Sequence, residues 1–321
     1  MKSMFISDIY IYSAFAFASL IIIMKSASYI IKAVSHYAKE TGVSDYLIGF
    51  LVVSIGTSLP ELTTSFMASF SGDNQIILGD IIGANIIDVT IVLGITSIIG
   101  KKLTVHGKII DKTIFTILTL SLLPFIFGFN GVISRIEGLL LIISFLIYIL
   151  ILLKKEGHFG QIKKQIYWKD IWQDIVIVSG CVIALLLSTK WLIISAQNLS
   201  SILNIPPYFV GLILMAAGTT IPELTVNISS ILSGSSGIAF GDILGSVVCN
   251  SSLVLGVGAL INPITFNRKL FIPNALFMVS AVFIAILYIK KKEITWEEGL
   301  SLILLYVTFL ASAGLLENLL G

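Results

Sequence analysis

The sequence predicts an all-α integral membrane protein, with ten transmembrane helices arranged as two inverted five-helix repeats. Of the 321 residues, 56% are hydrophobic and 12% are charged, whereas a soluble domain carries about 25% charged residues. Apolar runs of roughly 20 residues recur along the chain, and a helix of that length crosses the ~30 Å hydrocarbon core of a bilayer. In addition, one polar motif occurs twice inside apolar runs, at Gly56 and at Gly218.

Ten candidate spans follow one another with short polar connections between them. We expect helices at residues 9–31, 45–70, 76–99, 110–128, 134–153, 171–196, 207–232, 238–261, 270–289 and 297–319. The first run follows Lys2 and Asp8 without a small-residue cleavage site, so it is predicted to be a retained span rather than a signal peptide. The longest connection, residues 154–170, is too short to fold as a domain. It is predicted to be a linker between a first repeat at 1–153 and a second at 171–321.

The two halves align without a gap around the motif when the second is shifted by 162 positions. Between residues 48–100 and 210–262, 18 of 53 positions are identical. Chance similarity between apolar helices would match leucine with leucine and isoleucine with isoleucine. The shared residues here include glycine, proline, glutamate and aspartate, the last as Asp80 and Asp242. The alignment therefore indicates an internal duplication.

An odd number of spans in each half turns the second half upside down in the membrane relative to the first. Most lysines then fall on one side, namely Lys39, those between Lys101 and Lys112, the linker lysines and those from Lys290 to Lys292. The positive-inside rule predicts that this side is the cytoplasm and that both termini lie outside. The protein is expected in the plasma or inner membrane of the cell. Inverted repeats that meet at the midplane are a recurring plan of secondary transporters.

The repeated motif places a carboxylate near the centre of one span in each half. It reads GTSLPELT from Gly56 and GTTIPELT from Gly218, so the carboxylates belong to Glu61 and Glu223. A charge at that depth costs roughly 2.5–3.5 kcal/mol even on the lenient insertion scale, and such residues are functional by default. The alternative is a structural glutamate at a proline kink, which the duplication at mid-membrane disfavours.

Oxygen-bearing residues share a helix face with each glutamate. By helical spacing, the two faces consist of Ser54, Thr57, Ser58 and Glu61 in the first half and of Ala216, Thr219, Thr220 and Glu223 in the second. Pro60 and Pro222 also lack the amide hydrogen that would hold the carbonyl four residues earlier. In lipid a freed carbonyl is tolerated only where something else satisfies it. A bound Na⁺ or Ca²⁺ can do so, since Ca²⁺ takes about 6–8 oxygen ligands.

The next span in each half adds a second polar position near its centre. Asp88 and Asn250 are equivalent in the repeat, and Ala84 and Ser246 lie one turn earlier on the same faces. Glycines four residues apart allow these spans to approach the glutamates closely. Carboxylates that meet there cannot all stay ionised without cations, and this competition is a physical basis for exchange. The alternative role for Asp88 and Asn250 is hydrogen bonding between helices.

Other polar residues are interpreted structurally. Asp80 and Asp242 fall near the start of their spans, so favourable placement at a helix N-terminus near the interface is the first interpretation, with ion funnelling second. Cys181 and Cys249 have no metal-ligand spacing and are expected to be buried apolar filler.

At these residues the sequence resembles the sodium/calcium exchanger branch of the cation/Ca²⁺ exchanger superfamily. The repeats of that branch carry G-T-S-x-P-E, followed on the next helix by a G-N-x-x-G-S-N segment. This chain reads GTSLPELTTS with GDIIGANIID and GTTIPELTVN with GDILGSVVCN. The chain departs from the pattern at four positions. Aspartate replaces the first asparagine at Asp80 and Asp242, Ala84 replaces a serine, and Val247 replaces an asparagine.

The resemblance implies alternating access, with Na⁺ driving Ca²⁺ the other way. It implies that Glu61 and Glu223 are central ligands, that Thr57 and Thr219 contribute oxygens to Ca²⁺, and that Ser58, Thr220 and Ser246 serve flanking Na⁺ sites. Loss of the hydroxyl at Ala84 weakens the case for one Na⁺ site. The acid/amide pair at 88 and 250 occurs either way round in the superfamily, so K⁺ dependence stays open.

The hypothesis from the sequence is a secondary-active Na⁺/Ca²⁺ antiporter. The alternatives are an H⁺/Ca²⁺ exchanger, whose branch typically has G-N-x-x-E in place of G-T-S-x-P-E, and a K⁺-dependent Na⁺/Ca²⁺ exchanger. An enzyme is not expected, because no HExxH, no Gly-x-Ser-x-Gly and no reactive Cys/His pair occurs in the sequence. The predicted partners are Ca²⁺, Na⁺ and the lipid bilayer, with no cofactor, nucleic acid or partner protein.

Overall fold

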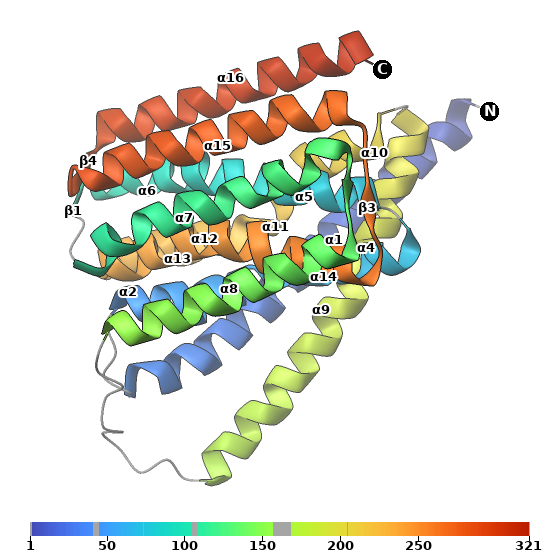
Figure 1. Ribbon diagram of the computed structural model, residues 1–321. Helices are drawn as coiled ribbons and strands as arrows, with labels where there is room; N and C mark the ends of the chain where they lie inside the picture. Colours follow the sequence, from blue (N-terminus) through green and yellow to red (C-terminus); the bar gives the residue numbers. More distant parts are fainter. Residues whose placement is uncertain are drawn as a thin grey trace.

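The protein is a bundle of long membrane-crossing helices (Figure 1). The computed structural model describes residues 2–40, 45–72, 74–104, 108–156, 168–203 and 205–320. Within these ranges nine helices are long and apolar enough to cross a membrane, and the bent pair Ile48–Thr57 and Leu59–Ser71 provides a tenth span. The ten predicted spans are therefore confirmed. The predicted linker falls largely on residues 157–167, which lie outside the described part of the chain.

The first half of the chain contains five spans. Its elements are α1 (Lys2–Glu40), α2 (Asp45–Leu47), the π-helical segment η1 (Ile48–Val53), α3 (Ser54–Thr57), α4 (Leu59–Ser71), α5 (Asn74–Ile87), the π-helical segment η2 (Asp88–Val92), α6 (Leu93–Gly100), β1 (Lys102–Thr104), α7 (Lys108–Phe127), the 3₁₀ turn η3 (Gly128–Asn130), β2 (Val132–Ile133) and α8 (Arg135–Glu156).

The second half repeats this order. Its elements are α9 (Trp168–Leu203), α10 (Pro207–Phe209), the π-helical segment η4 (Val210–Met215), α11 (Ala216–Thr219), α12 (Ile221–Leu232), α13 (Ser236–Val248), the π-helical segment η5 (Cys249–Val254), α14 (Leu255–Ile261), β3 (Ile264–Thr265), α15 (Arg268–Lys290), β4 (Glu293–Thr295) and α16 (Trp296–Leu320). The segment η4 lies at the 162-residue offset from η1, so the repeat extends to the local helix geometry.

Two short antiparallel ribbons join the halves and reveal their inversion. β1 pairs with β4, and β2 pairs with β3, so each ribbon takes one strand from each half. β1 and β3 are equivalent in the repeat, yet Figure 1 shows them at opposite ends of the bundle. The ion pair between Lys102 and Glu293, with 2.7 Å between Nζ and Oε1, reinforces the β1–β4 ribbon. Equivalent strands at opposite ends are what two inverted repeats require.

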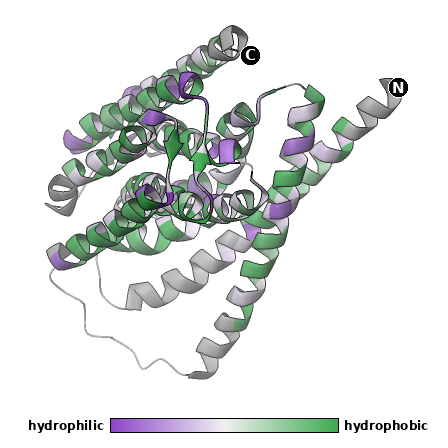
Figure 2. Ribbon diagram, turned by 45° about the vertical axis from the view of Figure 1, so that its right-hand side comes forward, coloured by the Kyte–Doolittle hydropathy of each residue, from purple (hydrophilic) through white to green (hydrophobic). Residues whose placement is uncertain are grey.

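Burial divides the spans into an inner and an outer set. The share of the apolar stretch that is buried inside the protein is 94% in the span Asn74–Gly100 and 83% in Ser236–Ile261. The corresponding share in α16 is 22%. Figure 2 shows hydrophobic residues along most of the outer helices, which face the lipid. The span Pro207–Leu232, which carries the second copy of the repeated motif, is intermediate at 61%. The glutamates of both copies are nevertheless fully buried, so side chains of the protein surround them in place of lipid.

The inner spans of opposite halves approach each other at the repeated glycines. Gly79 in α5 lies directly against the backbone of Tyr208 and Leu212, and the equivalent Gly241 in α13 lies against the backbone of Tyr46. A Cβ at either glycine would collide with a main-chain carbonyl, which cannot move aside as a flexible side chain can. Because both contacts cross between halves, they determine how closely the two repeats fit together.

We therefore predict opposite effects for two glycine-to-alanine substitutions. Gly180→Ala in α9 should be neutral or stabilising by up to about 1 kcal/mol, because nothing lies within 4 Å of the added Cβ and alanine favours the helix. Gly79→Ala should destabilise the protein by about 1–3 kcal/mol or more, because it overpacks the interface between the halves. Thermal unfolding in detergent measures both. Equal melting temperatures for the two variants would contradict the proposed role of Gly79.

Candidate functional site

Each glutamate of the repeated motif lies in the first turn of a helix that starts again in mid-membrane. The helices α4 and α12 begin one residue before Pro60 and Pro222, so Glu61 and Glu223 occupy their N-terminal turns. In the first half the chain bends by 43° at this break. The break therefore supplies more than the freed carbonyls predicted from the prolines. It also points the positive end of a helix dipole at each carboxylate.

Two π-helical segments precede these breaks, and two more lie on the spans that follow them. η1 ends immediately before Ser54, and η4 ends immediately before Ala216. η2 begins at Asp88, and η5 contains Asn250. Insertions of this kind shift the helix register and occur frequently at functional sites. They were not foreseen from the sequence, because residue spacing alone does not distinguish an α-helix from one with a π-helical turn.

The predicted carboxylates lie near one another and receive no hydrogen bonds from the described residues. Glu61, Glu223 and Asp88 are fully buried, and Glu223 lies close enough to both of the others to repel them electrostatically. Neither oxygen of any of the three receives a hydrogen bond from the described residues. Both polar atoms of the Asn250 amide and the Ser58 hydroxyl are likewise buried without a partner. Buried polar groups are almost always satisfied, so a set of unpartnered oxygens points to a ligand.

The predicted hydroxyl residues are buried beside these groups. The Thr57 hydroxyl lies 3.4 Å from that of Ser246, and the Thr219 hydroxyl lies beside the Glu61 carboxylate, although it makes no hydrogen bond of ordinary length with it. The Thr220 hydroxyl donates to the Ala216 carbonyl at 2.8 Å.

The residues that differ between the halves are also placed. The Ser54 hydroxyl donates to the Phe50 carbonyl, and its side chain lies against Gly245 in the opposite half. Ala216 occupies the equivalent position, and its carbonyl accepts from the Thr220 hydroxyl at 2.8 Å and from the Thr219 hydroxyl at 3.4 Å. Whether these residues bind a cation stays a prediction, but the structure brings both to the same buried region as the glutamates.

The interpretation of Asp80 and Asp242 was wrong. Both are buried, and neither lies in the first turn, since α5 begins at Asn74 and α13 at Ser236. Asp80 accepts a hydrogen bond from Thr219 at 3.2 Å, and Asp242 accepts one from Thr57 at 3.0 Å. Each bond joins opposite halves, so its partner is 139 or 185 residues away in the sequence. Sequence spacing within one span carries no signal of such a contact.

Asn227 was missed as well. Its amide donates to the Asp242 carboxylate at 2.5 Å and to the Glu223 carbonyl at 2.8 Å. A signal was present, because Asn227 stands four residues after Glu223 and therefore on the same helix face. In the first half Ser65 occupies the equivalent position and donates instead to the Val254 carbonyl at 2.9 Å.

Five buried carboxyl groups occur without a buried base beside them among the side chains that the structure describes. They belong to Glu61, Asp80, Asp88, Glu223 and Asp242, whereas no lysine or arginine with a described side chain is buried. No three acidic, histidine or cysteine side chains in the described ranges are close enough to hold a metal ion by themselves. A cation here would therefore need hydroxyl, amide or main-chain oxygens as well, which are the ligands that hard cations accept.

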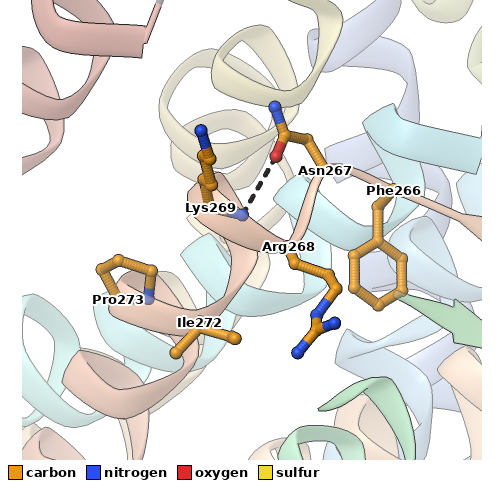
Figure 3. A pocket seen from close by; sticks show the side chains of 6 residues that line it. All are labelled: Phe266, Asn267, Arg268, Lys269, Ile272 and Pro273. Carbon is orange, nitrogen blue, oxygen red and sulfur yellow. Dashed lines mark hydrogen bonds between the residues drawn. The ribbon is translucent and has the colours of Figure 1, made fainter. Parts of the chain in front are cut away.

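The surface hollow shown in Figure 3 is not part of this site. It lies at the start of α15 and is lined by Phe266, Asn267, Arg268, Lys269, Ile272 and Pro273. The Asn267 side chain caps α15 by accepting the Lys269 amide at 3.0 Å. A smaller hollow of about 200 Å³ does reach the site, because Thr220 lines it together with Ile87 and Tyr306.

Comparison with known proteins identifies the family. A model of the sodium/calcium exchanger protein family matches residues 11–154 and 174–314, which is most of the chain. The chain belongs to the sodium/calcium exchanger family. As an exchanger of this family, it is a multi-pass membrane protein, its homologues are transporters, and cation/Ca²⁺ exchange is the activity that the match supports.

Individual relatives agree with this assignment. The sodium/calcium exchanger MaX1 of Methanosarcina acetivorans is 27% identical, over 91% of this exchanger and 95% of its own length. A structure of the sodium-calcium exchanger NCX_Mj superposes with a TM-score of 0.72 at 26% identity, covering 94% of this chain and 97% of the other. The sodium/potassium/calcium exchanger 4 of Mus musculus is 28% identical over only 36% of this chain and 19% of its own.

We predict that Ca²⁺ stabilises this exchanger through the unpartnered carboxylates. At a Ca²⁺ concentration about 100 times Kd, binding should add about 2.7 kcal/mol to the free energy of unfolding. Glu61→Gln should lose most of that gain, because it removes one charge without changing the size of the side chain. Glu297→Gln, at an exposed position in α16, is the matched control and should keep the full gain. The measurement is the rise in melting temperature on adding Ca²⁺. An equal rise in the two variants would contradict the assignment of Glu61 to the site.

Proposed function

We propose that this exchanger is a secondary-active antiporter that moves Na⁺ down its gradient to drive Ca²⁺ in the opposite direction by alternating access. The observation that carries the proposal is the pair of buried glutamates at equivalent positions of two inverted repeats, with all four carboxylate oxygens unpartnered. Inversion supports alternating access, because the same contacts can open towards either side of the membrane when the halves rock around a fixed central site.

The ligands follow from position and chemistry. Glu61 and Glu223 are the central ligands for Ca²⁺ and Na⁺, with Thr57 and Thr219 adding hydroxyl oxygens to the Ca²⁺ site. Ser58, Thr220 and Ser246 serve the flanking Na⁺ sites. Asp88 and Asn250 add further oxygen ligands from the neighbouring spans. One Ca²⁺ or several Na⁺ would offset a similar share of the buried negative charge. The two ions therefore compete for the same oxygens, which couples their movements.

The orientation of the chain is also part of the proposal. Both termini lie outside, the 154–170 linker between repeats 1–153 and 171–321 lies in the cytoplasm, and the protein resides in the cell membrane. The support is the distribution of lysines under the positive-inside rule.

Proteoliposomes test the coupling. Vesicles loaded with Na⁺ and diluted into Na⁺-free medium should take up Ca²⁺, and Glu61→Gln or Glu223→Gln should reduce this uptake to the level of protein-free vesicles. A K⁺ gradient and a pH gradient are imposed in parallel. Uptake driven only by the pH gradient would favour an H⁺/Ca²⁺ exchanger, and a requirement for K⁺ would favour the K⁺-dependent class.

The acid/amide pair allows a charge-swap prediction. Asp88→Asn should weaken Ca²⁺ transport at least tenfold, since it removes one of three unpartnered carboxylates around the ion. Adding Asn250→Asp restores the total charge on the equivalent span, so the double variant should recover part of the lost activity. Apparent KM for Ca²⁺ in the vesicle assay measures the effect. A double variant with a higher KM than Asp88→Asn alone would contradict the assignment of both residues to one site.

A further inference from the structure

Two aspartates outside the proposed ligand set form a symmetric pair of contacts between the halves. Asp80 accepts the hydroxyl proton of Thr219, and Asp242 accepts that of Thr57. Both pairs are related by the 162-residue offset, so the same interaction occurs twice across the interface. Neither carboxylate belongs to the ligand set of the proposed function.

A threonine hydroxyl has one proton to give and two lone pairs with which to accept. The Thr57 proton has three acceptors within reach: the Asp242 carboxylate at 3.0 Å, the Ser54 carbonyl at 3.2 Å and the Ser246 hydroxyl at 3.4 Å. The Thr219 proton also has three: the Met215 carbonyl at 3.1 Å, the Asp80 carboxylate at 3.2 Å and the Ala216 carbonyl at 3.4 Å. A charged acceptor forms the stronger hydrogen bond. The carboxylate therefore fixes the rotation of the hydroxyl, and this determines where its lone pairs point.

The fixed rotation matters because the Thr219 oxygen lies close to two carboxylates. It is 3.2 Å from Asp80, which takes its proton, and it also lies beside Glu61 without an ordinary hydrogen bond. With its proton directed to Asp80, the threonine keeps its lone pairs free to accept. A cation held by Glu61 then has a neighbouring oxygen whose proton is already engaged elsewhere.

We propose that Asp80 and Asp242 are positioning residues of the cation site, each acting through the threonine of the opposite half. The proposal rests on the proposed function, because it takes Thr57 and Thr219 to be ligands. Outer groups of this kind typically change metal affinity by about 10–100-fold when they are removed.

The two aspartates also bias the site towards divalent ions. Coulomb energy is proportional to the charge of the cation, so a carboxylate near the site strengthens binding of Ca²⁺ twice as much, in free energy, as binding of one Na⁺ at the same place. Replacing aspartate by asparagine keeps an oxygen that can accept the threonine proton but removes the charge. The fold-loss in Ca²⁺ affinity should then be roughly the square of the fold-loss for one Na⁺ ion.

The two aspartates differ in their other hydrogen bonds. Asp242 receives the second hydrogen bond from Asn227, which also contacts the Glu223 carbonyl, whereas Ser65 at the equivalent place in the first half donates to Val254. Asn227→Ser copies the first half into the second. It should weaken Ca²⁺ binding less than Asp242→Ala, because it leaves the Asp242–Thr57 bond in place.

A double-mutant cycle on Ca²⁺ binding tests the proposal. Equilibrium ⁴⁵Ca²⁺ binding is measured on the purified full-length protein in detergent for Asp80→Ala, Thr219→Val and the two combined. Each single change should weaken binding about 10–100-fold, and the double variant should be little weaker than the worse single one, because both remove the same interaction. The matched control combines Asp80→Ala with Thr57→Val, because the hydrogen-bond partners of Thr57 are Ser54, Asp242 and Ser246 rather than Asp80. The fold-losses of this pair should come closer to multiplying.

Several outcomes are decisive. Equal coupling in the bonded and the unbonded pair would overturn the proposal, and so would an Asp80→Asn variant whose Ca²⁺ and Na⁺ affinities both match those of the wild type. If Asp80→Ala does not fold, two milder variants replace it in the test. Asp80→Asn keeps the volume of the side chain, and Asn227→Ser keeps the hydrogen bond between Thr57 and Asp242.

Ca²⁺ binding at equilibrium does not depend on which ion drives transport. Wild-type protein that binds Ca²⁺ but shows no Na⁺-driven uptake would therefore refute Na⁺ coupling alone, whereas wild-type protein that binds no Ca²⁺ would refute both proposals.

Discussion

The rest of this structure depends on the cost of burying five carboxyl groups with no buried lysine or arginine among the described side chains. An isolated ionised group is expensive in a low-dielectric interior unless it is paired or coordinates a metal. Main-chain geometry offsets part of this cost, because one helix starts beside Glu61 and another beside Glu223. Two threonine hydrogen bonds to Asp80 and Asp242 offset a further part. The oxygens of Glu61, Glu223 and Asp88 have no partner among the described residues, so the proposed cation binding would stabilise the fold.

The same constraint explains why the inner spans pack so closely. Groups on four different spans can share one cation only if the main chains of those spans lie close together. Glycine provides that approach at Gly79 and Gly241, where main chain meets main chain across the halves. Helix breaks at Pro60 and Pro222 and the π-helical segments next to them then point the polar groups inward. Packing and chemistry are therefore two consequences of one repeated sequence.

Most of the fold and the centre of the site could be predicted from the sequence. Span length, the odd number of spans in each half and the paired GT[ST]xPE motif are local properties, and they led to ten helices and to Glu61 and Glu223. What could not be predicted depends on contacts between halves. Asp80 was taken for a residue at the membrane interface, because nothing near it in the sequence reveals Thr219. Asn227 lay within reach of the same spacing argument that found the glutamates.

The scaffold is symmetric, whereas the ligands are not, and this difference has a physical consequence. Inversion makes the two halves equivalent as structures, which in the proposed cycle lets the site face either side at similar free energy. Several departures from symmetry lie in the candidate site: Asp88 against Asn250, Ala84 against Ser246 and Ser65 against Asn227. The close main-chain contacts between the halves at Gly79 and Gly241 instead keep the same residue in both halves. Because these contacts use residues other than the candidate ligands, the ligands can differ between the halves while this packing stays the same.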